Sequence, residues 1–193
     1  QLSTTKNQPM KTIVASLLAL SLAFAQAADS LPSPEPKLAT IASLDVPRYM
    51  GTWFEIAKYP NSFQKQCVAD TRADYSVQPD GKLQVINRCR QADGEMSMAV
   101  GAARQLGDAQ SPRLEVRFAP AWLSFLPAVW GDYWVIDLDP AYQLVAVSEP
   151  KREYLWVLSR TAKVQPTAYE ALLARLASKG FDLKRLELSK QPD

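Results

Sequence analysis

The sequence predicts an all-β fold, an eight-stranded antiparallel up-and-down β-barrel followed by one C-terminal α-helix. Two observations predict it. Between residues 53 and 160, short apolar or alternating segments recur about every ten residues with turn signals between them, as in an antiparallel meander. Beyond residue 160, the apolar residues recur at helical spacing.

The links between these segments are short, so sequence neighbours are expected to pair. Eight strands in a meander leave two open edges unless the sheet closes on itself, and a closed barrel of this size encloses room for one small ligand. A flat sheet or a sandwich is the alternative. We favour it less because the Greek-key crossovers of a sandwich need longer links.

Eight segments are expected to be strands. They cover residues 53–59, 68–77, 83–89, 96–104, 113–118, 133–138, 143–148 and 154–160. Asp80-Gly81 and Asp93-Gly94 are strong signals for two-residue hairpin turns, and Asp139-Pro140 marks a turn of another type.

The helix is predicted from one apolar stripe at helical spacing. The stripe consists of Tyr169, Leu172, Leu173, Leu176 and Ala177. Thr167 and Glu170 have the spacing of a capping box, and Gly180 is a stop signal. Residues 182–188 are candidates for a last short strand.

The N-terminus has the pattern of an export signal. An apolar run follows Lys11 and ends in small residues, so residues 10–27 are predicted to be a cleaved signal peptide, too short to span a bilayer permanently. Residues 1–9 are then an upstream extension, residues 28–44 a flexible leader with several prolines, and residues 45–190 the folded domain.

The predicted cleavage site is followed by Ala or Asp and not by the Cys that a lipid anchor requires. We therefore expect a soluble periplasmic protein, whose association with the outer membrane would not depend on acylation. Two cysteines in an exported chain predict one disulfide, Cys67 to Cys89. A reactive thiol is the less favoured alternative, because it would need an electropositive neighbourhood.

Composition excludes several classes of function. The chain has no histidine, which excludes Ser-His-Asp and Cys-His catalysis and histidine-rich zinc sites. Removing residues 1–27 takes away two of the 22 basic residues and none of the 20 acidic ones, so the net charge falls to zero. A balanced chain has no electrostatic footprint for nucleic acid. We expect no metal, no cofactor and no nucleic-acid partner.

Four stretches identify a family. Gly51-Thr52-Trp53, preceded by the one-turn segment 46–50, opens the string GTWFEIAKYPNSFQ, and the chain also contains INRC, YWVIDLDPAYQLVAVS and YLWVLSR. Together they resemble the lipocalins, in particular the bacterial lipocalin and apolipoprotein D subgroup, over residues 45–190. The resemblance implies a calyx, a C-terminal helix packed outside the barrel, and binding of fatty acids, lysophospholipids or other small hydrophobic molecules.

Strand parity assigns a structural role to the closed end. If Trp53 points into the barrel floor, Glu55 and Ala57 point inward too, and Arg160 on the last strand can reach the Trp53 indole in a cation-π contact. We expect Gly51, Trp53 and Arg160 to close the floor, in preference to ligand contact.

The ligand site is predicted from the same resemblance. Tyr75, Asn87 and Trp156 match positions where apolipoprotein D-like members contact ligand. Inward parity adds the candidates Ala57, Val116, Phe118 and Leu158. A mostly apolar wall favours an acyl chain over a sugar or a nucleotide. The alternative is that Tyr75, Asn87 and Trp156 are ordinary wall residues of a filled core.

The segment 119–130 is apolar where loops are normally polar. An up-and-down barrel places it at the open end, where Trp122, Phe125 and Leu126 would form a lid or a tip that contacts a membrane transiently. Packing on the rim is the alternative.

These observations favour a carrier of small hydrophobic ligands without enzymatic activity. One alternative is an interaction protein that uses the 119–130 segment to bind a partner or a second copy, which leaves a dimer open. The less favoured alternative is a lipid-modifying enzyme that uses a carboxylate such as Glu55 or a free cysteine.

Overall fold

The computed structural model describes residues 37–192, so the predicted extension 1–9 and signal peptide 10–27 lie outside the described residues. Within the described part, nine strands form one sheet. They are β1 (Gly51–Lys58), β2 (Ala69–Val77), β3 (Leu83–Arg90), β4 (Met96–Gln105), β5 (Arg113–Arg117), β6 (Gly131–Leu138), β7 (Leu144–Ser148), β8 (Leu155–Ser159) and β9 (Glu187–Leu188).

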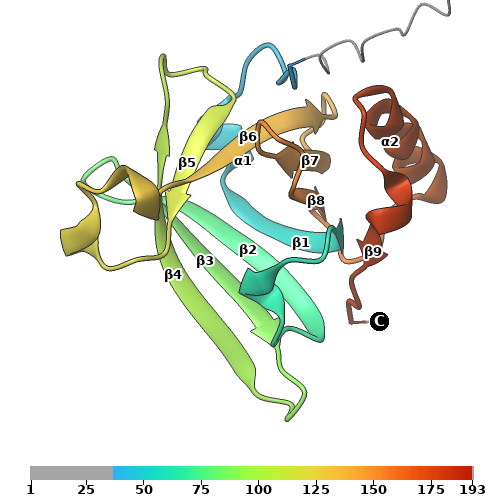
Figure 1. Cartoon of the computed structure of the whole chain (residues 1–193), viewed down its shortest axis with the longest axis horizontal. Helices are drawn as coiled ribbons and strands as arrows, with labels where there is room; N and C mark the ends of the chain where they lie inside the picture. The colour runs from blue at the N-terminus through green and yellow to red at the C-terminus, as the bar shows by residue number, and fades with distance from the viewer. Residues whose placement is uncertain (1–36, 193) are drawn as a thin grey trace, which may run out of the picture. The chain divides into compact units, whose positions relative to one another are not determined.

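The sheet closes into the predicted barrel. Each of β1 to β7 pairs antiparallel with the next strand, and β8 returns to pair with β1 (Figure 1). The eight-stranded up-and-down prediction for the described residues is therefore confirmed. The short strand β9 adds to β1 near the end of the chain.

The helical elements of residues 37–192 are short except for one. They are α1 (Val46–Tyr49), α2 (Pro166–Ser178) and the 3-10 turns η1 (Ser62–Gln64), η2 (Ala121–Leu123), η3 (Pro127–Val129) and η4 (Leu183–Arg185). In the part of the chain that the structure describes, no helix is long and apolar enough to cross a membrane.

Helix α2 ends as predicted but begins differently. Pro166 occupies the first helical position after the N-cap residue Gln165, so Thr167 lies inside the helix and the predicted capping box is wrong. At the other end Gly180 adopts a φ of 86°. The Phe181 amide donates to the Leu176 carbonyl across this turn, which is a Schellman closure.

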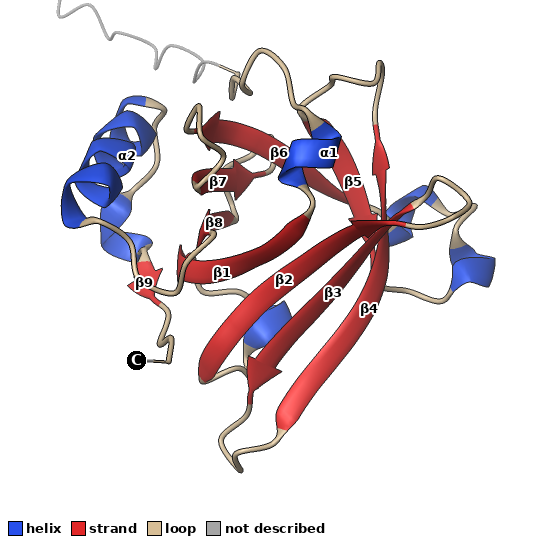
Figure 2. Ribbon diagram, turned by 180° about the vertical axis from the view of Figure 1, so that it is seen from behind, coloured by secondary structure: helices blue, strands red, loops and turns tan. Residues whose placement is uncertain are grey.

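The described residues bury two hydrophobic clusters. The inner one fills the closed end of the barrel, and its fully buried members include Leu44, Trp53, Val135, Val145 and Val147. The outer one lies between the barrel wall and α2, where Leu172 and Leu176 are fully buried. Figure 2 shows α2 outside the barrel, on the side of β7, β8 and β1, as predicted.

A β-bulge in β1 corrects one prediction. The pairing of β1 with β8 shifts between Glu55 and Ala57, which inserts one residue and reverses the parity of the strand. Glu55 faces inward, but Ala57 is buried in the outer cluster. The expected inward position of Ala57 is therefore wrong, and Lys58 lies opposite Trp156 instead.

The folded part starts earlier than predicted. Leu38 is buried in the outer cluster and Leu44 in the inner one. The Ile41 amide donates to the Val135 carbonyl at 3.0 Å. A flexible leader is therefore wrong for residues 37–44, because three apolar residues at a spacing of three anchor this stretch to the barrel. Residues 28–36 lie outside the described part.

Candidate functional site

The closed end of the barrel is held by Arg160 and Trp53. The Arg160 guanidinium lies 3.9 Å from the centroid of the Trp53 ring, so the predicted cation-π contact is present. The same guanidinium donates to the backbone carbonyls of Arg48, Tyr49 and Thr52 at 2.8–3.1 Å. Trp53 is fully buried, and its Nε1 donates to the Tyr49 carbonyl at 2.8 Å.

Gly51 is required at this end for two reasons. Its φ of 98° is in the region that favours glycine. A Cβ on Gly51 would also lie 3.2 Å from Arg160 Nη1. Gly51, Trp53 and Arg160 are absent from the residues that line the cavity described next, so their placement agrees with a role in closing the floor.

A cavity of about 850 Å³ opens from the floor toward the other end of the barrel. Six of the seven predicted ligand residues line it: Tyr75, Asn87, Val116, Phe118, Trp156 and Leu158. The seventh, Ala57, does not. These side chains therefore border an open space, and Tyr75 and Leu158 are at the same time members of the inner hydrophobic cluster. Whether they contact ligand stays a prediction.

Some residues of the cavity wall lie in loops at the mouth, where the alternation of a strand makes no prediction. Two loops, at residues 63–67 and 149–154, supply much of the rim, with Lys151 and Glu153 exposed at the entrance. These loop positions have no periodic signal in the sequence. Only the barrel closure brings them together.

The inner face of β4 is built from small residues. Ser97, Ala99 and Gly101 lie opposite Cys89, Asn87 and Val85 of β3. A Cβ on Gly101 would lie 2.8 Å from two ring carbons of Phe118 and 2.8 Å from the Arg117 carbonyl oxygen. Phe118 therefore packs directly on Gly101, and the absent side chain leaves room for the ring.

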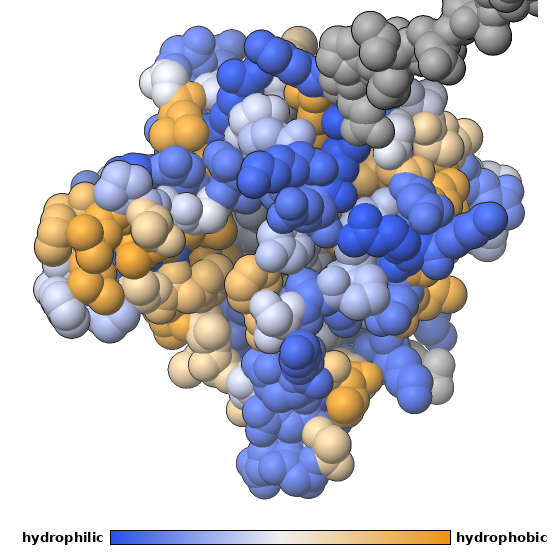
Figure 3. Space-filling model, in the orientation of Figure 1, coloured by the Kyte–Doolittle hydropathy of each residue, from blue (hydrophilic) through white to orange (hydrophobic). Residues whose placement is uncertain are grey.

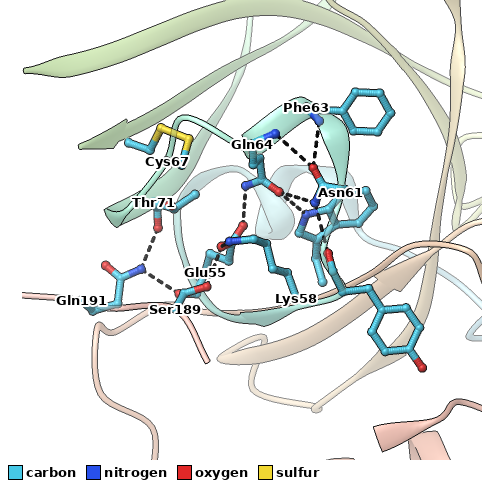
Figure 4. Close-up of polar contacts among 12 residues, drawn as sticks. Glu55, Lys58, Asn61, Phe63, Gln64, Cys67, Thr71, Ser189 and Gln191 are labelled. Carbon is cyan, nitrogen blue, oxygen red and sulfur yellow. Dashed lines mark hydrogen bonds and ion pairs between the residues drawn. A yellow bond between two sulfur atoms is a disulfide. The ribbon is translucent and has the colours of Figure 1, made fainter. Parts of the chain in front are cut away.

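A polar network lies around Glu55, which is only 2% exposed. Its Oε1 accepts from Lys58 Nζ at 3.2 Å and from Ser189 Oγ at 2.6 Å, and its Oε2 accepts from Gln64 Nε2 at 2.6 Å. Figure 4 shows these three side chains converging on the carboxylate from β1, the η1 turn and the C-terminal tail.

The same network orients a wall residue of the cavity. Gln64 Oε1 accepts from Trp156 Nε1 at 2.9 Å and from Asn61 Nδ2 at 2.8 Å. Asn61 in turn caps the η1 turn through its side-chain oxygen. The indole of Trp156 is therefore held by the loop at the mouth, 92 residues away in the sequence.

Three tyrosine hydroxyls form a chain at the bottom of the cavity. Tyr133 Oη lies 2.7 Å from Tyr49 Oη and 2.9 Å from Tyr75 Oη. Burial raises the pKa of Tyr75 to about 12 and raises the pKa values of Tyr49 and Tyr133 well above the ordinary tyrosine value. The cluster is therefore uncharged near neutral pH. Tyr75 and Tyr133 line the cavity, whereas Tyr49 does not.

The predicted disulfide joins Cys67 to Cys89, with their Cα atoms 5.4 Å apart. Both residues line the cavity, near the mouth. They are the two cysteines of the sequence, so an enzyme that uses a free thiol would have no thiol in this chain. The disulfide ties the loop before β2 to β3.

The apolar segment 119–130 has two parts. Trp130 folds back on the barrel: its Nε1 donates to the Ser124 carbonyl at 2.9 Å, and its ring stacks on Arg104 at 4.1 Å. Trp122 and Phe125 are 72% and 73% exposed. Figure 3 shows an apolar patch at the left of the molecule, where Figure 1 places this segment between β5 and β6.

The three predicted tip residues, Trp122, Phe125 and Leu126, do not line the cavity. Ala119, Ala128, Val129 and Trp130 of the same segment do line it, so the two ends of the segment border the cavity and the three tip residues do not. Rim packing describes Trp130, whereas an exposed tip describes Trp122 and Phe125.

Comparison with known proteins agrees with the resemblance. The family model of a lipocalin-like domain matches residues 44–191. The outer membrane lipoprotein Blc of Citrobacter freundii is 35% identical over 175 residues, which cover 90% of this chain and 94% of that protein. Apolipoprotein D of Mus musculus is 30% identical over 156 residues, which cover 77% and 78%.

Among solved structures, insecticyanin from the tobacco hornworm Manduca sexta superposes with a TM-score of 0.64. The superposition covers 84% of this chain and 89% of that one, at 18% sequence identity. At this identity the likeness concerns the fold alone.

Proposed function

The chain belongs to the lipocalin-like family, whose barrels bind small hydrophobic ligands, and we propose that its ligand is a fatty acid or a lysophospholipid. The observation that carries the proposal is the cavity of about 850 Å³ with its mostly apolar wall. An acyl chain suits such a wall, whereas a sugar or a nucleotide needs many fixed polar partners. A charged headgroup has water and the exposed Lys151 and Glu153 side chains at the mouth.

Binding without catalysis is supported by the groups nearest the cavity. The Glu55 carboxylate, the candidate for acid-base chemistry, has both oxygens occupied by donors from Lys58, Gln64 and Ser189. The two cysteines are bonded to each other. These contacts favour a carrier over the lipid-modifying enzyme.

The test is native mass spectrometry of the protein purified from an envelope extract, with lipid analysis of what dissociates. Ala99→Trp places a large ring into the cavity from the inner face of β4, and Met98→Trp adds the same ring on the exposed outer face. We expect an acyl lipid on the original protein and on Met98→Trp, and none on Ala99→Trp. A protein that stays empty and ignores added acyl lipids would contradict the proposal.

We also propose that the 119–130 segment contacts a lipid surface during loading. Trp122 and Phe125 are exposed, and residues 118–131 contain no charged side chain, beside the mouth of the cavity. Interfacial tryptophan and phenylalanine suit the headgroup boundary of a bilayer. The alternative is that the same side chains bind a protein partner or a second copy.

Vesicles of phosphatidylethanolamine and phosphatidylglycerol test this contact. Sedimentation with the vesicles should be lost in Trp122→Ser/Phe125→Ser and kept in Met98→Ser, which removes an exposed apolar side chain from the outer face of β4. Concentration-dependent self-association without vesicle binding would support the interaction alternative and contradict the membrane contact.

We further propose an extracytoplasmic location. The Cys67–Cys89 disulfide supports it, because disulfides persist in oxidising compartments. The name of the Citrobacter freundii relative places that protein at the outer membrane. Export is tested by fractionating cells that produce the chain and by sequencing the mature N-terminus, which we expect near residue 28.

A further inference from the structure

The tyrosine cluster at the cavity floor has more donors than internal acceptors can use. Three hydroxyls in a line make two hydrogen bonds with one another, among the described residues. Each hydroxyl supplies one proton. Two protons therefore lie in the internal bonds, and the third O–H group is left to donate outside the cluster.

The position of that free O–H follows from counting the arrangements. Tyr75 Oη donates to Tyr133 Oη, whereas the bond between Tyr49 and Tyr133 can run in either direction. If Tyr49 also donates to Tyr133, the Tyr133 proton is free. If Tyr133 donates to Tyr49, the Tyr49 proton is free. The first arrangement leaves the free donor on Tyr133, which lines the cavity.

The surroundings of Tyr49 disfavour the arrangement in which the Tyr49 proton is free. Tyr49 is fully buried under the Trp53 ring, at a centroid distance of 5.0 Å. Its carbonyl already accepts from Trp53 and Arg160, and the positive charge of Arg160 lies close to its hydroxyl. A buried O–H without an acceptor costs free energy. The free proton is better placed at Tyr133, which lines the cavity, so that a ligand can accept it.

The surroundings of the floor also favour a ligand whose hydrogen-bond acceptor is uncharged. The three hydroxyls are neutral near neutral pH, and the charged group that acts on them, Arg160, lies behind Tyr49 with its guanidinium on Trp53. An ionised carboxylate there would lose its water without gaining a counter-charge. An uncharged oxygen needs no counter-charge.

We propose that the floor of the cavity is a neutral donor site, formed by Tyr75 and Tyr133, that selects hydrophobic ligands with an uncharged oxygen acceptor on the end that enters first. This inference rests on the proposed carrier function and narrows its ligand. Two sources have this chemistry. One is a neutral lipid that enters polar end first, such as an alcohol, an aldehyde or a protonated acid, and the other is an acyl chain oxygenated at its far end.

The variants for the test are chosen from the number of hydroxyl protons in the cluster. Removing Tyr75 alone still leaves two hydroxyls that share one bond, so one free O–H remains. The double variant Tyr75→Phe/Tyr133→Phe removes both hydroxyls on cavity-lining residues. Tyr49→Phe is the matched control, because it deletes a hydroxyl of the same cluster and leaves a free donor at the cavity. Circular dichroism and thermal melts check that both variants fold.

The ligands are matched in size. Dodecanol and tridecane have the same number of heavy atoms, and each is titrated against a bound fluorescent probe. We expect dodecanol to bind at least about fivefold more tightly than tridecane to the original protein and to Tyr49→Phe, as one hydrogen bond of ordinary net strength allows. The preference should disappear in the double variant.

A second pair separates the two sources. If ω-hydroxydodecanoate binds more tightly than dodecanoate, the floor site binds an oxygen at the far end of the acyl chain. If dodecanoate binds more tightly as the pH is lowered through its own pKa, the neutral acid enters first. Equal binding of dodecanol and tridecane to the original protein would overturn the floor site while leaving the carrier function intact. Failure of all four ligands to displace the probe would instead contradict the carrier function.

Discussion

The Arg160 guanidinium joins the two ends of the folded sequence at the barrel floor, stacked 3.9 Å from the Trp53 ring centroid and hydrogen-bonded to the Arg48 and Tyr49 carbonyls. The contact spans more than a hundred residues of chain. It holds α1 against the first and last strands, below the cavity and not within it.

Replacement of Arg160 by Ala should therefore reduce stability and leave ligand affinity almost unchanged. We expect a loss of about 2–4 kcal/mol in the free energy of unfolding, because a cation-π contact and several hydrogen bonds disappear together. Urea unfolding measures the loss, and an acyl-probe titration measures the affinity. Arg113→Ala is the control, because it removes an exposed guanidinium stacked on Trp134 at 4.6 Å and should cost less than about 1 kcal/mol. A large loss of affinity in Arg160→Ala at unchanged stability would place Arg160 in the ligand site.

Gly101 sets the width of the cavity. In Gly101→Ala the new methyl group would lie 2.8 Å from the Phe118 ring and from the Arg117 carbonyl, so the ring must move and the β4–β5 pairing must spread. We expect a destabilisation of about 1–3 kcal/mol and weaker binding of bulky ligands than of slender ones. Gly131→Ala, whose Cβ would meet its nearest atom at 3.9 Å, is the control for stability and should not destabilise the protein. An unaltered ligand profile in Gly101→Ala would show that Phe118 does not limit the cavity.

The C-terminal tail closes a split in the barrel wall. Pairs between β1 and β2 extend only from Gly51 to Phe54 on β1, and Gln191 Nε2 bridges the gap beyond them by donating to the Glu55 and Thr71 carbonyls at 2.7 and 2.8 Å. The Asp70 amide donates to the Lys190 carbonyl across the same gap. The tail therefore forms hydrogen bonds to β1 and β2 in the region where these two strands do not pair with each other.

Gln191→Ala should loosen this seam. We expect a loss of about 1–3 kcal/mol, because two hydrogen bonds of a half-buried side chain are removed. Hydrogen exchange should become faster at the Asp70 and Ser189 amides, which bond across the seam, and stay unchanged at the Val135 amide on β6. Gln66→Ala, which removes one local bond in an exposed loop, is the control. Unchanged exchange at Asp70 would mean that the side chain does not hold the seam.

Alkaline pH should destabilise the protein through the tyrosine cluster. Burial holds the pKa values of Tyr49, Tyr75 and Tyr133 above the ordinary value of about 10, that of Tyr75 at about 12. Above pH about 10 the unfolded chain loses these protons while the folded chain keeps them. The stability contributed by the neutral hydroxyls is therefore full below that pH and falls as the pH rises.

Urea unfolding as a function of pH measures this slope. Tyr75→Phe/Tyr133→Phe should flatten it, although part remains because burial also raises the pKa values of Tyr59 and Tyr169. An equal slope in the double variant would mean that the cluster does not govern alkaline unfolding.

The amino-acid sequence by itself determined the barrel, its strand order, the outer helix, the disulfide and the contact of Trp53 with Arg160. These features rest on period-two segments, short links and motif strings, all of which are local patterns or simple consequences of pairing neighbours. Of the six predicted residues that line the cavity, Tyr75, Asn87 and Trp156 follow from the family resemblance. Val116, Phe118 and Leu158 follow from strand parity, because a strand keeps its faces as long as no residue is inserted.

The tertiary structure alone decided which face of β1 carries Ala57 and which distant residues contact one another. The bulge after Glu55 sent Ala57 to the outer cluster, because one inserted residue reverses parity without a marker in the sequence. The Tyr49–Tyr133–Tyr75 chain and the Gln191 bridge join residues 58 to 136 positions apart. No local period encodes such contacts, since they form only when barrel closure brings distant strands, the floor helix and the tail to the same place.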